Sequence, residues 1–145
     1  MALPEPVPGL VVRYSYLWLR EQLAGAEEGR KDRPSAVVAA IRDRSGERRV
    51  LVLPITHSPP SADDGAIELP PAVKRRLGLD ELRSWIVVSE YNEFLWPGPD
   101  LRRAHGGDDS SVAYGMLPPA LFAAVRQALL AAIGERRARS VRRTE

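Results

Sequence analysis

The chain has 145 residues, of which 44% are hydrophobic, so it can bury one sizeable core and a single domain is expected. It contains no cysteine, which excludes disulfides, thiolate nucleophiles and cysteine-ligated metal sites. The formal net charge is +2, and the final GERRARSVRRTE segment alone contributes +3, so the rest of the chain does not predict a globally basic nucleic-acid-binding body, although a local basic groove is compatible with it.

The chain begins with sheet-forming segments. Residues 9–18, GLVVRYSYLW, have the apolar and aromatic residues typical of a strand, and a polar, glycine-containing loop follows. Pro34 is expected to open a second strand that runs to about Ile41, because proline is tolerated as the first residue of a strand. A turn in RDRSGER leads to a third strand over residues 49–56, RVLVLPIT. We expect these three strands to be antiparallel.

A short helix is predicted next, in the segment IELPPAVKRRLG. Pro71 suits the first turn of a helix, and Gly78 suits the position just after its end. Leu69, Val73 and Leu77 share one face, which predicts that this face is buried.

The last third combines a strand, a connector and a helix. Residues 84–96 are strand material that we expect to be interrupted near Asn92, and residues 97–111 read as a long irregular connector. The segment PPALFAAVRQALLAAIGERR predicts a helix that lies against the sheet or a partner and continues past Gly134 into a frayed, arginine-rich end. Its apolar stripe consists of Leu121, Phe122, Val125, Leu129 and Ile133.

These elements predict a mixed α+β fold, with a small curled antiparallel sheet, a short helix and a C-terminal helix. We place one domain over residues 1–137 and a basic, disordered tail over residues 138–145.

The ends of the second and third predicted strands carry the side chains that are the best candidates for binding or catalysis. Arg33 stands at the start of one, and Thr56, His57 and Ser58 close the other. In a hairpin these ends meet, so a cation and hydroxyl groups can address one ligand, a combination that suits a phosphate. The alternative is an ordinary surface arginine beside a polar turn, and residue type alone favours that alternative.

Metal and cofactor sites are not indicated. The two histidines have no partners at metal-ligand spacing, and no glycine-rich phosphate loop follows a strand. Residues 107–111, GDDSS, lack the alternating oxygen ligands and the terminal glutamate of a calcium loop. We therefore expect no metal and no cofactor.

The order of these segments resembles that of the MazF/PemK toxins of toxin-antitoxin systems. The pieces are GLVVRYSY, a polar loop with Gly25 and Glu27, then DRPSAVV and LVLPITHS; the likeness covers about the first sixty residues and extends loosely to Trp96. The resemblance implies an SH3-like small β-barrel, a homodimer, an antitoxin partner and ribosome-independent cleavage of single-stranded RNA. Carried over residue by residue, it places Arg33 and Thr56 in the active site.

That reaction is the attack of a ribose 2′-hydroxyl on the neighbouring phosphate, without a metal. Arg33 suits the stabilisation of developing negative charge, because a guanidinium stays protonated and holds phosphate oxygens through two parallel hydrogen bonds. Thr56 is expected to position the phosphate or the 2′-hydroxyl. His57 is a candidate acid or base, although a loop histidine is more often an ordinary surface residue.

We assign RNA contacts to Ser58 and to aromatic side chains near the first strand, which can stack on unpaired bases, although such aromatics are more often core residues. The alternative to an endoribonuclease is a catalytically inactive SH3-like barrel that binds nucleic acid or a protein partner. A cytoplasmic protein without membrane contact is expected, because no stretch reaches the length of a span and the start MALPEPVPG lacks the parts of a signal peptide. The aromatic candidates are Tyr14, Tyr16 and Trp18.

Overall fold

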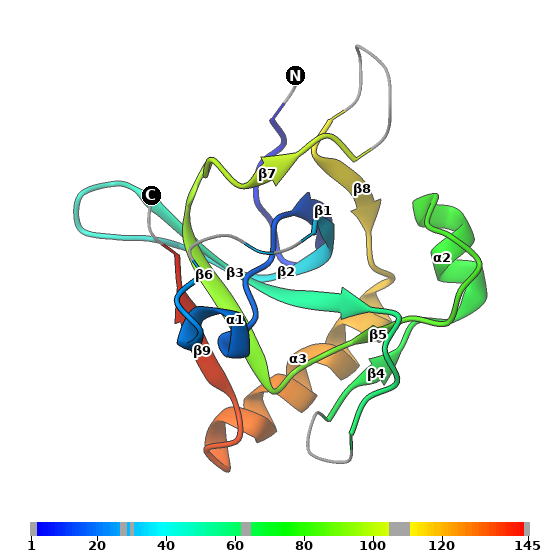
Figure 1. The fold of residues 1–145 in the computed structure, drawn as a ribbon. Helices are drawn as coiled ribbons and strands as arrows, with labels where there is room; N and C mark the ends of the chain where they lie inside the picture. Colours follow the sequence, from blue (N-terminus) through cyan, green and yellow to red (C-terminus); the bar gives the residue numbers. More distant parts are fainter. Residues whose placement is uncertain (1–2, 27–28, 30, 62–64, 105–110, 144–145) are drawn as a thin grey trace.

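The fold is a mostly antiparallel, curled sheet accompanied by helices, as seen in a computed structural model that describes residues 3–26, 29, 31–61, 65–104 and 111–143 (Figure 1). This confirms the predicted α+β class. The elements are β1 (Leu10–Tyr14), α1 (Leu19–Leu23), β2 (Arg33–Arg42), β3 (Arg48–Thr56), β4 (Ile67–Glu68), α2 (Pro71–Leu77), β5 (Trp85–Ile86), β6 (Glu90–Trp96), β7 (Leu101–Arg102), β8 (Ala113–Met116), α3 (Pro119–Gly134) and β9 (Arg139–Arg142).

The strands β1, β2 and β3 lie side by side and antiparallel, as predicted. The β2–β3 turn is closed by Asp43, whose carboxylate accepts hydrogen bonds from the backbone N–H groups of Ser45 and Glu47. Gly46 takes a φ of 87°, a left-handed conformation that glycine adopts without steric cost. Because this turn is short and local, it sets the register in which Ser35 faces Pro54.

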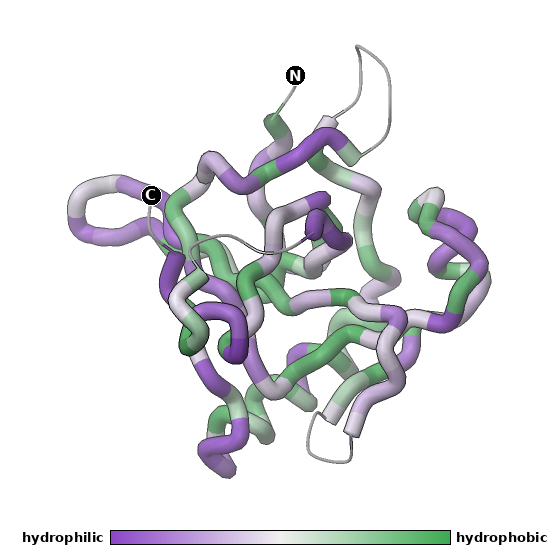
Figure 2. Tube along the Cα trace, viewed as in Figure 1, coloured by the Kyte–Doolittle hydropathy of each residue, from purple (hydrophilic) through white to green (hydrophobic). Residues whose placement is uncertain are grey.

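Two hydrophobic cores lie on the two faces of this sheet, since successive residues of a strand point to opposite faces. The first core collects Val12, Val50 and Val52 with the aromatic rings of β1 and β6. The second core collects residues such as Val11 and Leu53 under α3. Figure 2 shows hydrophobic residues along the central strands and hydrophilic ones at the β2–β3 turn.

The helices α2 and α3 cover the second core. Helix α2 begins at Pro71, and Gly78 follows its end in the left-handed conformation with a φ of 71°, as predicted. Leu69, Val73 and Leu77 all pack into the second core. Helix α3 buries Val125, Leu129 and Ala132.

The strand expected over residues 84–96 is interrupted at a different point from the one predicted. The break lies at residues 87–89, between β5 and β6, whereas Asn92 lies inside β6. Asn92 is fully buried there because its side chain accepts a hydrogen bond from the Leu17 N–H at 2.9 Å and donates one to the Leu17 carbonyl at 2.7 Å. The connector after residue 96 also contains β7, which pairs with β1.

The expectation of a disordered tail over residues 138–145 is wrong for residues 139–143. Strand β9 pairs in parallel with β6, and the Arg143 side chain that follows is buried. Arg143 forms an ion pair with Asp100 at 2.9 Å and donates hydrogen bonds to Tyr14 Oη and Asn92 Oδ1. The buried carboxylate and carbonyl-type acceptors hold the guanidinium, so this arginine-rich segment completes the sheet.

The sheet remains open. The pairing order runs β4-β5-β3-β2-β1-β7, with β6 and β9 branching from β3 and β8 pairing with β1. Within the described ranges, no pairing joins the two ends of this order, so the closed SH3-like barrel stays a prediction from the resemblance.

Candidate functional site

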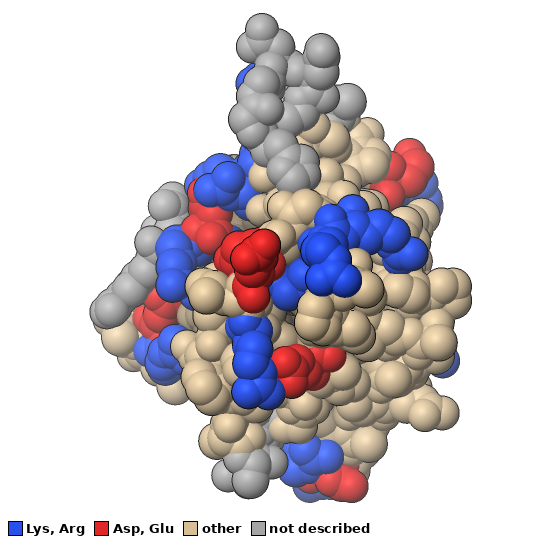
Figure 3. Space-filling model, turned by 90° about the vertical axis from the view of Figure 1, so that its right-hand side faces the viewer, with Lys and Arg blue, Asp and Glu red and all other residues tan. Residues whose placement is uncertain are grey.

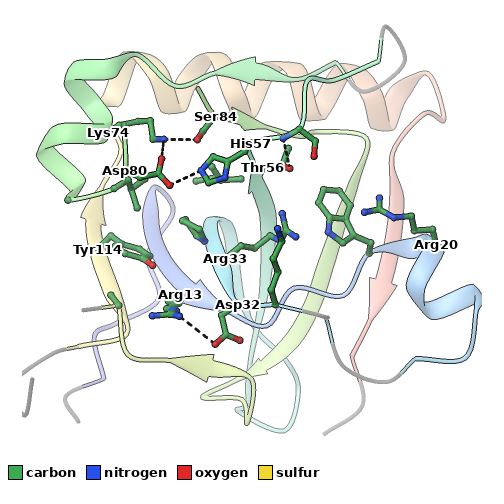
Figure 4. Close-up of a pocket in the computed structure, with 18 residues that line it drawn as sticks. Arg13, Arg20, Asp32, Arg33, Thr56, His57, Lys74, Asp80, Ser84 and Tyr114 are labelled. Carbon is green, nitrogen blue, oxygen red and sulfur yellow. Dashed lines mark hydrogen bonds and ion pairs between the residues drawn. The ribbon is translucent and has the colours of Figure 1, made fainter. Parts of the chain in front are cut away.

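The ends of β2 and β3 meet at a cavity of about 420 Å³. The hairpin register that pairs Ser35 with Pro54 carries Arg33 and Thr56 to the same edge of the sheet. Arg33, Thr56 and His57 all line this cavity, and Figure 4 shows them around one hollow. The structure therefore brings together the three side chains predicted to be catalytic.

Arg33 is partly buried at the cavity wall. Its guanidinium carbon lies 5.1 Å from the centre of the Trp18 ring, a cation–π distance. Its Nε is buried and has no hydrogen-bond partner among the described residues. Burial lowers the pKa of Arg33, Glu21 opposes that effect, and Arg20 adds to it, yet a guanidinium still remains charged near neutrality. Arg33 thus places a partly desolvated cation at the cavity wall.

Trp18 lies in the cavity wall, and the residue is 7% exposed. Arg20 also approaches this ring, with 4.7 Å between its guanidinium carbon and the ring centre. The start of α1 fixes the position, because the Trp18 N–H donates to the Glu21 carboxylate at 3.1 Å. Trp18 therefore supports the two arginines, and base stacking on it stays a prediction.

Thr56 is buried at the end of β3. Its hydroxyl oxygen accepts a hydrogen bond from the Ser58 N–H at 3.1 Å. That contact leaves the hydroxyl proton of Thr56 as a donor. Ser58 lines the same cavity, so both hydroxyl residues named from the sequence lie at the site.

Lys74 and Asp80, which the sequence did not single out, also line this end of the cavity. His57 Nε2 lies 2.8 Å from Asp80 Oδ2, and Asp80 Oδ1 lies 2.6 Å from Lys74 Nζ. Lys74 belongs to α2, and Asp80 comes just after it. Asp80 follows the glycine that ends α2, and in the sequence this pattern indicates only a loop. No local pattern indicates that this loop lies beside the end of β3.

The cavity wall is mainly cationic. The charged side chains that line it in the described ranges are Arg13, Arg20, Lys31, Arg33 and Lys74, with Asp32 and Asp80 as the acids. Figure 3 shows one face of the molecule on which lysine and arginine groups gather with acidic groups between them. A cationic wall with polar donors favours an anionic ligand.

The positions of Tyr14 and Tyr16 contradict their predicted role in base stacking. Both rings are fully buried. Tyr14 stacks on Phe94 at 4.6 Å between ring centres, and the Tyr16 hydroxyl donates to the Glu90 carboxylate at 3.2 Å. Burial, together with the Glu90 charge, raises the pKa of Tyr16 well above its ordinary value. Tyr14, in β1, and Tyr16, just after it, are both residues of the first core.

The described part of the chain contains no group of three or more histidine, aspartate or glutamate side chains that could hold a metal ion. In the same part, no helix is both long and apolar enough to cross a membrane.

The fold and the cavity together define an α+β protein whose curled antiparallel sheet has a mainly cationic cavity at one edge. Among solved structures, the chain is similar to a mycobacterial endoribonuclease solved in complex with its cognate antitoxin. The TM-score is 0.52 at 17% sequence identity, and the match covers 89% of this chain and 95% of that chain. This shared fold agrees with the resemblance to MazF/PemK toxins. No protein-family description and no curated protein matches the chain.

Proposed function

We propose that this protein is a MazF/PemK-like toxin, an endoribonuclease that cleaves single-stranded RNA without a metal ion. The observation that carries the proposal is the position of Arg33, whose partly buried guanidinium lies in one cavity with Thr56 and His57. A phosphodiester offers the oxygens that such a guanidinium binds. The fold shared with a solved endoribonuclease supports the same choice of substrate.

In the proposed reaction, the 2′-oxygen of a ribose attacks the adjacent phosphorus. The 2′-hydroxyl proton passes to His57, the bond between phosphorus and the 5′-oxygen breaks, and the leaving oxygen takes a proton from water. The products are a 2′,3′-cyclic phosphate and a 5′-hydroxyl end. Arg33 stabilises the charge that develops on the phosphoryl oxygens, in a partly buried site where this interaction is stronger than in water.

Thr56 and Ser58 hold the substrate in this proposal. The Thr56 hydroxyl donates its proton to a phosphate oxygen, because its own oxygen already accepts the Ser58 N–H. The cations Arg13, Arg20 and Lys31 around the cavity attract the flanking phosphates.

The proposal extends to the oligomeric state, the protein partner and the location in the cell. We propose a homodimer, since open sheet edges favour pairing with another chain. The solved neighbour was captured with its cognate antitoxin, which supports an antitoxin as a partner here. We propose the cytoplasm as the location, where single-stranded RNA is available as a substrate.

The decisive experiment is incubation of the purified protein with a long single-stranded RNA, followed by mapping of the cut ends. Cuts that persist in EDTA and leave 2′,3′-cyclic phosphate and 5′-hydroxyl ends are expected. An Arg33→Lys preparation, purified in parallel, controls for a contaminating nuclease. Cleavage that EDTA abolishes contradicts the mechanism, and RNA binding without any cleavage supports the inactive nucleic-acid-binding alternative.

A further inference from the structure

His57, which directly follows β3, faces the carboxylate of Asp80 in the loop after α2. Its Nε2 lies 2.8 Å from Asp80 Oδ2, which is hydrogen-bonding distance. Asp80 held as a carboxylate only accepts hydrogen bonds, so the ring nitrogen that faces it must carry a proton. In the neutral imidazole the second nitrogen, Nδ1, then carries the lone pair.

Asp80 is itself fixed by Lys74, whose side chain is only 5% exposed. The Lys74 ammonium donates to Asp80 Oδ1 at 2.6 Å, to Ser84 Oγ at 2.7 Å and to the Leu82 carbonyl. An ammonium has three N–H donors, and all three are used inside the fold. Lys74 is therefore an anchor for the loop after α2, although it lines the cavity.

A second hydrogen bond to Oδ1 also fixes the Asp80 carboxylate. The Leu82 N–H donates to Asp80 Oδ1 at 3.1 Å. Two donors thus hold Oδ1 and leave Oδ2 for His57, so the carboxylate has one orientation. His57 is half exposed, and without this partner its ring is free to rotate.

We propose that Asp80, anchored by Lys74, is a positioning residue that keeps the proton of neutral His57 on Nε2 and so offers Nδ1 as the acceptor for the 2′-hydroxyl proton. This inference rests on the proposed function and adds to it the residue that sets the tautomer and orientation of the base. A carboxylate on the far nitrogen also stabilises the imidazolium that forms when Nδ1 accepts the proton. Asp80 itself does not touch the substrate.

The test combines imidazole NMR with kinetics on Asp80→Asn. Nitrogen-15 spectra of the side chains, recorded at about pH 8 where an ordinary histidine is neutral, report which ring nitrogen carries the proton. The chain has only two histidines, so a His57→Gln variant assigns the signals. We expect the Nε2–H form in the parent protein and the Nδ1–H form in Asp80→Asn, because Lys74 and the Leu82 N–H hold the amide oxygen and leave the amide NH2 to donate to Nε2. Glu135→Gln, which alters an exposed ion pair with Arg137 just after α3, is the matched control.

In RNA cleavage, we expect kcat of Asp80→Asn to fall at least about tenfold with KM nearly unchanged, because proton transfer is impaired and phosphate binding is not. Glu135→Gln is expected to cleave like the parent. A parent His57 with its proton on Nδ1, or an Asp80→Asn variant as fast as the parent, overturns the inference. If no RNA is cleaved but Asp80→Asn still removes a parental Nε2–H preference, the proposed function fails while the positioning of His57 by Asp80 is upheld.

Discussion

The guanidinium carbon of Arg33 lies 5.1 Å from the centre of the Trp18 ring. This contact joins the first residue of β2 to the residue that precedes α1, and it holds a cation at the cavity wall where burial has removed part of its water. The ring face replaces some of the lost hydration. A partly desolvated arginine of this kind interacts strongly with an incoming phosphate.

Arg33→Lys is expected to lower cleavage by about two orders of magnitude, or roughly 3 kcal/mol of transition-state stabilisation. Lysine keeps the charge but loses the planar two-pronged contact and the stacking on Trp18. The melting temperature is expected to change little, because Arg33 is only partly buried. A gel assay and a thermal melt measure both quantities, and Arg44→Lys in the exposed β2–β3 turn is the control. Parental cleavage by Arg33→Lys contradicts the site assignment.

Two substitutions at Trp18 test whether its aromatic ring, and not only its bulk, supports Arg33. Trp18→Phe keeps an aromatic face and is expected to retain cleavage within about threefold, whereas Trp18→Leu removes the cation–π partner and should lower kcat about tenfold. Steady-state kinetics on a short RNA measure both. Equal activity of the Leu and Phe variants shows that the ring does not support Arg33.

Thr56→Ala is expected to lower cleavage by roughly tenfold, the equivalent of one hydrogen bond, whereas Thr56→Ser restores most of the activity. The serine hydroxyl can still accept the Ser58 N–H and donate its proton to the phosphate. Initial rates on the same RNA compare the two variants. If Ser and Ala are equally impaired, the methyl group of Thr56 matters and its hydroxyl does not.

Arg143→Met is expected to destabilise the protein by about 3 to 5 kcal/mol, because it leaves the buried Asp100 carboxylate without this ion pair. Urea unfolding measures the loss. Arg142→Met is the matched control: its pair with Glu93 is largely exposed on the arginine side, so a loss below about 1 kcal/mol is expected. Equal losses in the two variants contradict the role assigned to the buried end of the chain.

The stability of the protein is expected to depend on Asp80 in acid. Burial by itself raises the pKa of Asp80, but the hydrogen bonds from Lys74 and the Leu82 N–H and the charge of His57 outweigh it and lower the pKa. A carboxylate with a lowered pKa in the folded state stabilises the fold above its unfolded-state pKa, and this stabilisation is lost as the pH falls through the folded-state value.

The stability difference between the parent and Asp80→Asn should therefore shrink from about pH 5 to about pH 2. Urea unfolding across this range measures the difference. A difference that stays constant shows that the Asp80 carboxylate does not contribute to acid unfolding.

The amino-acid sequence by itself determined those features that depend on residues close together in the chain. Pro71 and Gly78 bound α2 because one residue lacks a backbone N–H and the other tolerates a positive φ. The meeting of Arg33 and Thr56 was predictable because a short turn fixes the register of the β2–β3 hairpin.

Only the tertiary structure decided what depends on contacts between distant segments. The aromatic residues in and after β1 do not by themselves indicate whether their rings face a core or the solvent. In the structure Tyr14 and Tyr16 are fully buried, so they are core residues instead of base-stacking ones. Arginine near the end of a chain indicates exposure, yet Arg143 is buried because Asp100 and Asn92, brought to it by the sheet, supply its partners. The anchoring of His57 requires the loop after α2 to lie against the end of β3, a placement set by packing in the second core and not by any local pattern.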